Sequence, residues 1–346
     1  MSRFRFVTSI ACLVFSLAMA PAAAFAQVAG NPLAVELPKV FSETFLNFPE
    51  DAADAAKEGK RLLVYFGQDG CPYCKELLET NFSQKSIADL ASKKFLSVGL
   101  NMWGDRETTW FDGVVRSEKE LARHLKVQFT PTILLLDEKG STIARLNGYL
   151  PPHRFTVALD YSAKRLENRI SFADHMLKAP SKGARATLGE QSFFMRAPSG
   201  QALDLRRKPG GKPLAVVFET RHSAHCDEMH DEGFKRESTL AALRRFDVAR
   251  FALSRKESVI TPSGEKLVAA KWAKALKIAY TPSVVFFDDS GKEVFRLETY
   301  VRPFHLASSF EYVGSGSHRK EPEFQRFLQN KAEHMKEQGE KLELWK

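Results

Sequence analysis

The pattern of apolar and polar positions predicts strands and helices in a definite order. An apolar run at residues 60–66 predicts a buried strand, and a helix is predicted to begin at 75–78, directly after a Cys-Pro-Tyr-Cys turn. A second apolar run at 132–136 is expected to form a hairpin with residues 141–147 across the turn 137–140. The order strand, helix, crossover and hairpin indicates an α/β domain.

The same order of elements returns in the second half of the chain. Strands are predicted at 213–218 and 283–287, and the latter is followed by a hairpin partner at 292–297. Landmark residues recur at a spacing of 151 or 152 positions, among them Phe66 with Phe218, Cys74 with Cys226, Pro131 with Pro282 and Tyr149 with Tyr300. Two copies of one architecture predict two tandem domains.

The first 26 residues have the features of a secretory signal peptide. An apolar run at 6–20 follows Arg3 and Arg5 and leads to the small-residue step that ends at Ala26. The run is too short for a comfortable membrane span, which takes about 20 residues. We therefore expect cleavage near Ala26 and a periplasmic or secreted protein.

The remaining chain is expected to divide into four parts. These are a redox-active domain at 27–168, a linker at 169–190, a degenerate domain at 191–316 and a C-terminal helical tail at 317–346. The tail carries apolar residues at helical spacing, namely Phe324, Phe327, Leu328, Ala332 and Met335. This pattern favours a helix docked along one apolar stripe, with a partner-binding helix as the alternative.

Composition and charge exclude several classes of protein. The 346 residues are 44% hydrophobic and 27% charged, so the chain is neither fibrous nor a disulfide-dense miniprotein. The formal net charge of +9 falls by two when the signal peptide is removed, and a secreted chain of this composition is not expected to bind nucleic acid.

Three cysteines remain after cleavage, and their spacing indicates redox chemistry. Cys71 and Cys74 are three residues apart, and Cys226 leaves an odd number in an oxidising compartment. A structural disulfide across so short a loop gains little entropy, and a zinc site would need a second pair of ligands in the same copy. We therefore expect a redox-active Cys71–Cys74 pair.

The position of the pair relative to the predicted helix assigns a role to each cysteine. Cys71 falls at the helix N-terminus, where backbone N–H groups and the helix dipole stabilise a thiolate, so it is the expected nucleophile. Cys74 lies one turn further on and is the expected resolving thiol. Pro72 stiffens the turn.

A family resemblance follows from these residues. A strand, the Cys-Pro-Tyr-Cys turn, a helix and then Thr130-Pro131 at the start of the next strand resemble the thioredoxin superfamily. The run 68–83 is most similar to the periplasmic thioredoxin-like group that includes SoxW-type proteins and the C-terminal domain of DsbD. The resemblance implies an α/β fold of two tandem thioredoxin-like domains, each a mixed central sheet flanked by helices, followed by a C-terminal helix.

The resemblance also implies an activity and a substrate site. Pro131 would be cis, and Thr130 would offer its backbone to an extended peptide, with Pro72 and Tyr73 beside it. The implied protein is an exported thiol-disulfide oxidoreductase that reduces protein disulfides and is recharged by a membrane electron donor of the DsbD or CcdA type. No cofactor is implied beyond the redox-active disulfide itself.

Two departures from the family pattern affect these expectations. Gly70 and Tyr65 stand where classical thioredoxins have a Trp and a buried Asp, so the carboxylate that assists proton transfer is missing from its usual place, and Asp69 or Glu76 are candidate substitutes. The Pro-Tyr dipeptide is that of glutaredoxins, but export and an enlarged crossover at 101–118 argue against dependence on glutathione.

The second copy has lost the nucleophile. Ser223 replaces the first cysteine, while Cys226, Thr281 and Pro282 are kept. An unassisted hydroxyl is not appreciably ionised near neutral pH, so this degenerate site cannot perform dithiol chemistry. We expect Cys226 to be a buried leftover, the alternative being a mixed disulfide with a partner or with another copy in a homodimer.

A metal site in the second copy is an alternative hypothesis. His222, Cys226 and His230 recur at i, i+4 and i+8 and would suit copper or zinc. Positions i and i+8 are about 12 Å apart along a helix, too far to share one ion unless His222 lies in the preceding turn. The rival function is therefore a module that binds copper or a client protein, whose thiols the cysteine pair keeps reduced.

Overall fold

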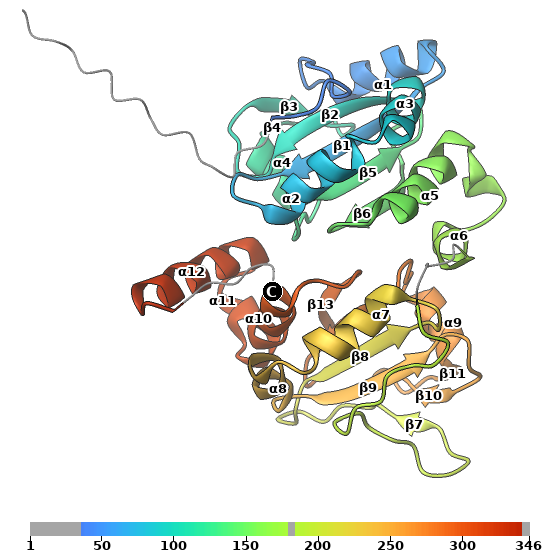
Figure 1. Ribbon diagram of the computed structural model, residues 1–346, viewed down its shortest axis with the longest axis vertical. Helices are drawn as coiled ribbons and strands as arrows, with labels where there is room; N and C mark the ends of the chain where they lie inside the picture. Colours follow the sequence, from blue (N-terminus) through green and yellow to red (C-terminus); the bar gives the residue numbers. More distant parts are fainter. Residues whose placement is uncertain (1–35, 179–183, 341–346) are drawn as a thin grey trace, which may run out of the picture.

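The computed structural model describes residues 36–178 and 184–340, which form two α/β domains in tandem (Figure 1). Each domain has a mixed four-stranded sheet with helices packed against it, which is the predicted fold class. The predicted signal peptide lies outside the described residues. Within the described ranges, no helix is both long enough and apolar enough to cross a membrane.

The first domain contains the three strands predicted for it, each to within one residue. Its strands are β1 (Arg61–Gly67), β2 (Phe95–Asn101), β3 (Glu107–Thr109), β4 (Val115–Ser117), β5 (Thr132–Leu136) and β6 (Thr142–Asn147). The sheet order is β2-β1-β5-β6, with β1 parallel to β2 and antiparallel to β5, while β3 and β4 form a separate ribbon.

Helices cover both faces of this sheet. They are α1 (Phe48–Lys57), α2 (Pro72–Glu76), which continues as the π-helix η1 (Leu77–Asn81), α3 (Lys85–Lys94), α4 (Glu118–His124), α5 (Pro152–Ala163), the 3-10 helix η2 (Leu166–Asn168) and α6 (Phe172–Lys178). Because side chains alternate along a strand, Leu63 and Tyr65 pack with α3 and α5, whereas Leu62 and Val64 pack with α1 and α4. The segment expected to be a linker thus contains α6, which packs against Tyr161 of α5.

The second domain repeats this sheet. Its strands are β7 (Leu203–Asp204), β8 (Leu214–Glu219), β9 (Asp247–Ala252), β10 (Ser258–Ile260), β11 (Lys266–Val268), β12 (Ser283–Phe287) and β13 (Glu293–Leu297). The order β9-β8-β12-β13 matches that of the first domain, and β7, β10 and β11 form a small additional sheet. Both hairpins have a register shift at the same point, between Leu135 and Leu136 in one and between Phe286 and Phe287 in the other.

The helices of the second domain end in the predicted C-terminal helix. They are α7 (Ala224–Glu228), which continues as the π-helix η3 (Met229–Gly233), α8 (Glu237–Leu243), α9 (Ala269–Ala275), α10 (Pro303–Gly314), α11 (Ser317–Lys320) and α12 (Phe324–Glu337). The buried residues of α12 are Phe324, Gln325 and Leu328, and the Phe324 ring packs against Phe295 and Tyr312. The docked helix expected from the apolar stripe is therefore present.

Strands β6 and β13 of the two domains are turned toward each other (Figure 1), and the contacts beside them indicate an approximate internal two-fold axis. Corresponding residues meet at the centre of this interface. The side-chain amide of Asn147 donates to the carboxylate of Glu298, and a Cβ on Gly148 would lie 3.0 Å from Cγ2 of Thr299. Both pairs are separated by 151 positions, the spacing of the sequence repeat, as in the isologous interface of a symmetric dimer.

Each domain also inserts an aromatic side chain into the other. Phe129 lies with its ring centroid 5.5 Å from those of both Phe295 and Phe324. Tyr280, the corresponding residue, joins the core of the first domain, and its hydroxyl donates to the carbonyl of Arg145 over 3.1 Å. Because these aromatics directly precede the two Thr-Pro pairs, the faces that carry those pairs are turned toward each other.

Candidate functional site

The Cys71–Cys74 pair lies where β1 ends and α2 begins. The two cysteines form a disulfide, with their Cα atoms 5.2 Å apart. Cys71 is the N-cap residue of α2, and its Sγ accepts a hydrogen bond from the backbone N–H of Cys74 at 3.1 Å. Because N–H groups at a helix N-terminus stabilise a thiolate, Cys71 has the environment of an attacking sulfur.

The Thr130–Pro131 loop adjoins the cysteine pair. Its peptide bond is cis, and the carbonyl oxygen of Thr130 lies 3.5 Å from Sγ of Cys71. The residues predicted for the catalytic and substrate sites of the first domain are therefore brought together at one end of its sheet.

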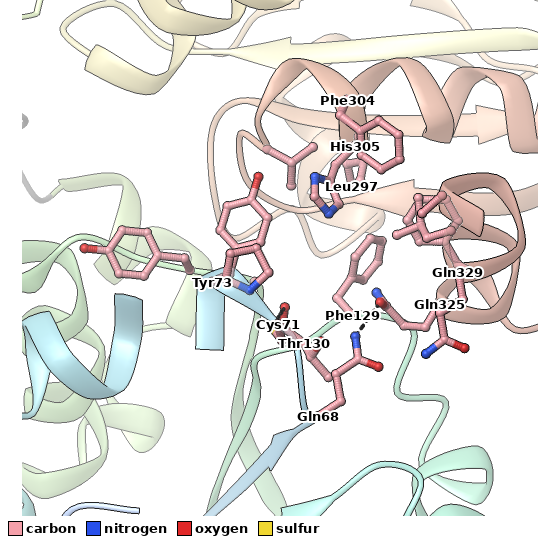
Figure 2. Close-up of a pocket in the computed structure, with 18 of the residues that line it drawn as sticks. Gln68, Cys71, Tyr73, Phe129, Thr130, Leu297, Phe304, His305, Gln325 and Gln329 are labelled. Atoms are coloured by element: carbon pink, nitrogen blue, oxygen red, sulfur yellow. Dashed lines mark hydrogen bonds between the residues drawn. The ribbon is translucent and has the colours of Figure 1, made fainter. Parts of the chain in front are cut away.

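A cavity of about 170 Å³ lies beside Cys71 and is walled by both domains (Figure 2). The second domain supplies mainly apolar and aromatic side chains to it, namely Leu297, Tyr300, Val301, Phe304, His305, Phe324 and Leu328. Cys71 is only 5% exposed and Thr130 6%. A folded protein therefore cannot reach the sulfur in this arrangement of the domains.

Hydrogen bonds across the interface hold the second domain over the cavity. The side-chain amide of Gln68 donates to Gln325 at 2.8 Å, as Figure 2 shows, and Gln325 donates to the carbonyl of Gln128 at 3.2 Å. The backbone N–H of Arg302 donates to the hydroxyl of Tyr73 at 2.7 Å. Tyr73, one of the expected substrate-binding residues, is thus a buried contact between the domains.

The titratable groups near the cysteine pair and the cavity differ from the family pattern. Tyr65 is buried, and its pKa is raised by that burial. Of the two candidate substitutes for the missing carboxylate, Asp69 lines the cavity but is exposed, and Glu76 accepts a hydrogen bond from Thr80 instead. His305 lies edge-on to the ring of Tyr73, and burial lowers its pKa to about 4, so the wall holds a neutral imidazole at neutral pH.

The comparison with protein families agrees with this site. A thioredoxin-like domain model matches residues 48–163 and 203–314, which together make up more than half of the chain. The chain belongs to the thioredoxin-like family. The two matches confirm that it contains tandem thioredoxin-like domains, and no curated protein matches it.

Solved structures of thioredoxin-fold proteins align with part of the chain. A thioredoxin-fold protein from Helicobacter pylori is 27% identical over 40% of this chain and 86% of its own, with a TM-score of 0.34. A thioredoxin from Thermus thermophilus is 26% identical over 33% and 81%, with a TM-score of 0.27. The oxidised C-terminal domain of DsbD from Neisseria meningitidis is 16% identical over 36% and 97%, also with a TM-score of 0.27.

The second thioredoxin-like domain keeps the geometry of the site without its nucleophile. Ser223 is the N-cap of α7, and its hydroxyl oxygen accepts from the backbone N–H of Cys226 and donates to the carbonyl of Thr281, each at 3.3 Å. The Thr281–Pro282 bond is cis. Cys226 is 2% exposed, and burial together with the nearby Glu219 carboxylate raises its pKa to about 12. The expected burial of Cys226 is therefore confirmed.

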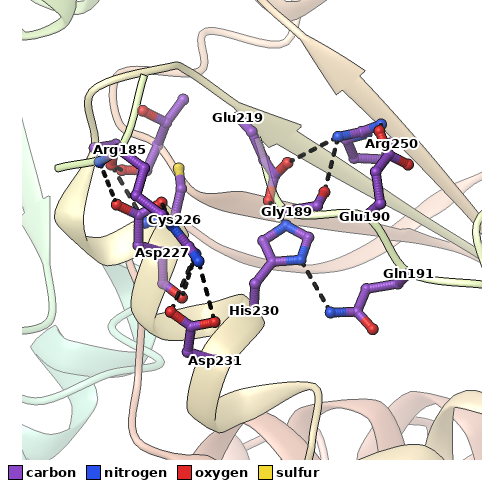
Figure 3. Close-up of polar contacts among 12 residues, drawn as sticks. Arg185, Gly189, Glu190, Gln191, Glu219, Cys226, Asp227, His230, Asp231 and Arg250 are labelled. Carbon is purple, nitrogen blue, oxygen red and sulfur yellow. Dashed lines mark hydrogen bonds and ion pairs between the residues drawn. The ribbon is translucent and has the colours of Figure 1, made fainter. Parts of the chain in front are cut away.

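A buried polar cluster lies behind Cys226 in this domain (Figure 3). The ring Nε2 of His230 lies 2.7 Å from the carboxylate of Glu219, and both side chains are almost completely buried. Gln191 contacts the other ring nitrogen, and Arg250 lies 3.8 Å from the second carboxylate oxygen of Glu219. Both ring nitrogens of His230 are therefore in contact with other side chains of the protein.

The three metal-ligand candidates do not form a ligand set. His222 lies in the turn before α7 with a φ of 58°, at the position where Gly70 has a φ of 72° in the first domain. His230 faces Glu219 rather than His222. In the part of the chain that the structure describes, no group of three or more His, Cys, Asp or Glu side chains is placed to hold a metal ion.

Sequence reasoning missed the contributions of the second domain to the redox cavity. The 151-residue spacing places His305 at the position of Arg154, at the start of a helix in each copy, but it does not indicate which domain's cavity the residue lines. Gln325 lies on the buried stripe of α12, where its hydrogen-bond partners are separated from it by about two hundred residues or more. No local pattern marks such a contact.

Proposed function

We propose that this chain is an exported thiol-disulfide oxidoreductase that reduces protein disulfides with the Cys71–Cys74 dithiol. The observation that carries the proposal is the N-cap position of Cys71, whose sulfur accepts the backbone N–H of Cys74 beside the Pro131 loop. Membership of the thioredoxin-like family supports it. The signal-peptide pattern of residues 1–26 supports export.

The reaction transfers two electrons from the dithiol to the substrate. The Cys71 thiolate attacks one sulfur of the substrate disulfide, forming a mixed disulfide and releasing a thiolate that takes up a proton. Cys74 gives up its proton and attacks the Cys71 sulfur, which releases the second substrate thiol and leaves the Cys71–Cys74 disulfide. A second dithiol must then reduce this disulfide, and a membrane donor of the DsbD or CcdA type fits that need in an oxidising compartment.

The proposal is tested with the purified mature chain, dithiothreitol as the reducing dithiol and insulin as the protein disulfide. Wild type is expected to accelerate insulin reduction, and Cys71→Ser to abolish the acceleration because no attacking thiolate remains. Reduced Cys74→Ser, incubated with insulin after dithiothreitol has been removed, is expected to accumulate a mixed disulfide, visible as an added mass that fresh dithiothreitol removes.

The chain offers its own control. Cys226→Ser removes a buried thiol of the second domain and is expected to leave the rate unchanged, since that thiol has no part in the exchange. A wild-type rate in Cys71→Ser would refute the proposal, as would a rate in wild type no higher than that of dithiothreitol alone.

A further inference from the structure

A second cleft lies between the domains, at the position that corresponds to the redox cavity under the internal two-fold symmetry. It has a volume of about 380 Å³ and is bordered by the degenerate turn 220–225 and by Thr281. The first domain supplies the facing wall with Pro151, His153 and Arg154. Its volume falls in the range of ligand sites, about 300–1,000 Å³.

The residues that line this cleft are basic where their counterparts at the redox cavity are not. Two of the differences introduce an arginine, Arg221 in place of Asp69 and Arg154 in place of His305. Three others introduce a histidine: His222 for Gly70, His225 for Tyr73 and His153 for Phe304. One fold thus presents two equivalent clefts, of which one is apolar and redox-active and the other is basic and lacks the nucleophile.

The cleft carries a clear excess of positive charge. Three basic side chains, Arg154, Lys178 and Arg221, border it, and Glu228 is the single carboxylate among the described lining residues. Arginine side chains bind carboxylates through paired, charge-assisted hydrogen bonds. We propose that this cleft binds an anionic ligand, a carboxylate-bearing molecule no larger than a short peptide.

The surroundings of His225 support this proposal. Burial is the largest cause that lowers the pKa of His225 to about 4, and the positive charges of Arg154, His153 and Arg302 lower it further, so these neighbours give the site a positive potential. A bound carboxylate would offset that potential. It would therefore raise the pKa of His225, which gives a readout separate from affinity.

Binding at this cleft needs no redox chemistry. Ser223 has its hydroxyl in a hydrogen bond to the carbonyl of Thr281, and the thiol of Cys226 is buried behind it. The proposal therefore goes beyond the oxidoreductase function and does not depend on it. Cys71→Ser is expected to bind the ligand as wild type does.

The test is calorimetric titration of the full mature chain near physiological ionic strength. The probes are a blocked Glu-Glu-Gly peptide, the matching Gln-Gln-Gly peptide and inorganic phosphate, so that a peptide carboxylate is distinguished from a free oxyanion. The acidic peptide is expected to bind about tenfold or more tightly than the neutral one, because only it carries carboxylates. Tighter binding of phosphate than of the acidic peptide would overturn the assignment to a carboxylate ligand.

Two variants and a matched control locate the site. Arg154→Gln and Arg221→Gln are each expected to weaken binding of the acidic peptide by about tenfold. Arg221 is exposed, so its variant keeps the test valid if Arg154→Gln fails to fold. Arg236→Gln removes the same charge from an exposed position outside the cleft and is expected to have little effect. Equal weakening by all three variants, or no binding at about 1 mM peptide, would overturn the proposal.

Discussion

Acidification should destabilise the second domain through two half-buried histidines, His225 and His305. Each lies in one of the two clefts between the domains, and burial lowers the pKa of each from 6.5 to about 4. In the unfolded chain the same imidazoles take up a proton near pH 6.5. Between these values the unfolded state binds more protons, so the free energy of unfolding falls as the pH falls from 6.5 toward 4.

The size of the effect follows from the two pKa values. At pH 5 the unfolded imidazole is almost fully protonated and the folded one is mostly neutral, which lowers the free energy of unfolding by about 2 kcal/mol per histidine relative to pH 7.5. The two residues lie in different clefts, so their contributions should add to about 4 kcal/mol. This is a large fraction of the total stability of an ordinary domain.

Urea unfolding at pH 7.5 and at pH 5, followed by circular dichroism, measures this loss. The double variant His225→Gln with His305→Gln keeps polar side chains that do not titrate, so its loss between the two pH values should be smaller than that of wild type by about 4 kcal/mol. His334→Gln removes an exposed histidine of α12 and serves as the control. If the double variant loses as much stability as wild type, the two histidines are not buried in neutral form and the reasoning is refuted.

Two further predictions concern the interior of the second domain. In the reduced native chain at pH 8, iodoacetamide should modify Cys71 but leave Cys226 unmodified, because Cys226 is buried and its pKa of about 12 keeps it protonated. Mass spectrometry of the peptides measures the modification of each cysteine. Equal modification of the two would contradict this prediction. Glu219→Ala should lower the free energy of unfolding by about 3 kcal/mol, because it leaves the buried His230 without its carboxylate partner. An unchanged urea midpoint would count against the role given to this contact.

The sequence predicted those parts of the structure that depend on local chemistry. The strands of both hairpins follow from apolar runs closed by turns, and β5 begins and ends at the predicted residues. The N-cap position of Cys71 follows from a cysteine placed between a strand and a helix. The repeat spacing of 151 residues predicted a second domain with the same fold, because both copies must bury the same faces of their sheets.

The packing of the two domains could not be predicted in this way. Phe129 and Tyr280 were available as apolar residues beside the Thr-Pro pairs, but nothing local shows that each packs into the other domain. The two clefts lie at equivalent places in the two domains. They differ in the side chains that line them, many supplied by the opposite domain, and in the added helix beside each, α12 at the redox cavity and α6 at the other cleft. The apolar lining of one cleft and the basic lining of the other could therefore be recognised only from the structure of the two packed domains.

Because α12 is docked against the first domain, a large molecule should reach Cys71 only when the two domains move apart. Gln325 connects α12 to the first domain through two hydrogen bonds, to Gln68 and to the carbonyl of Gln128. Each contributes about 1 kcal/mol net, so Gln325→Ala should favour the open arrangement by about 2 kcal/mol, roughly 30-fold. The reduced variant should then react faster by up to that factor with a maleimide attached to a large polymer. Reaction with the small reagent iodoacetamide should change much less.

The comparison of the two reagents separates opening from a change in the sulfur itself. A variant that altered the pKa of Cys71 would change both rates together, because both reagents need the thiolate. Glu333→Ala alters an exposed residue of the same helix and should leave both rates as in wild type. If the bulky and the small reagent keep the same ratio of rates in wild type and in Gln325→Ala, then α12 does not control access. Protein disulfides would in that case have to reach Cys71 by a route that leaves this helix docked.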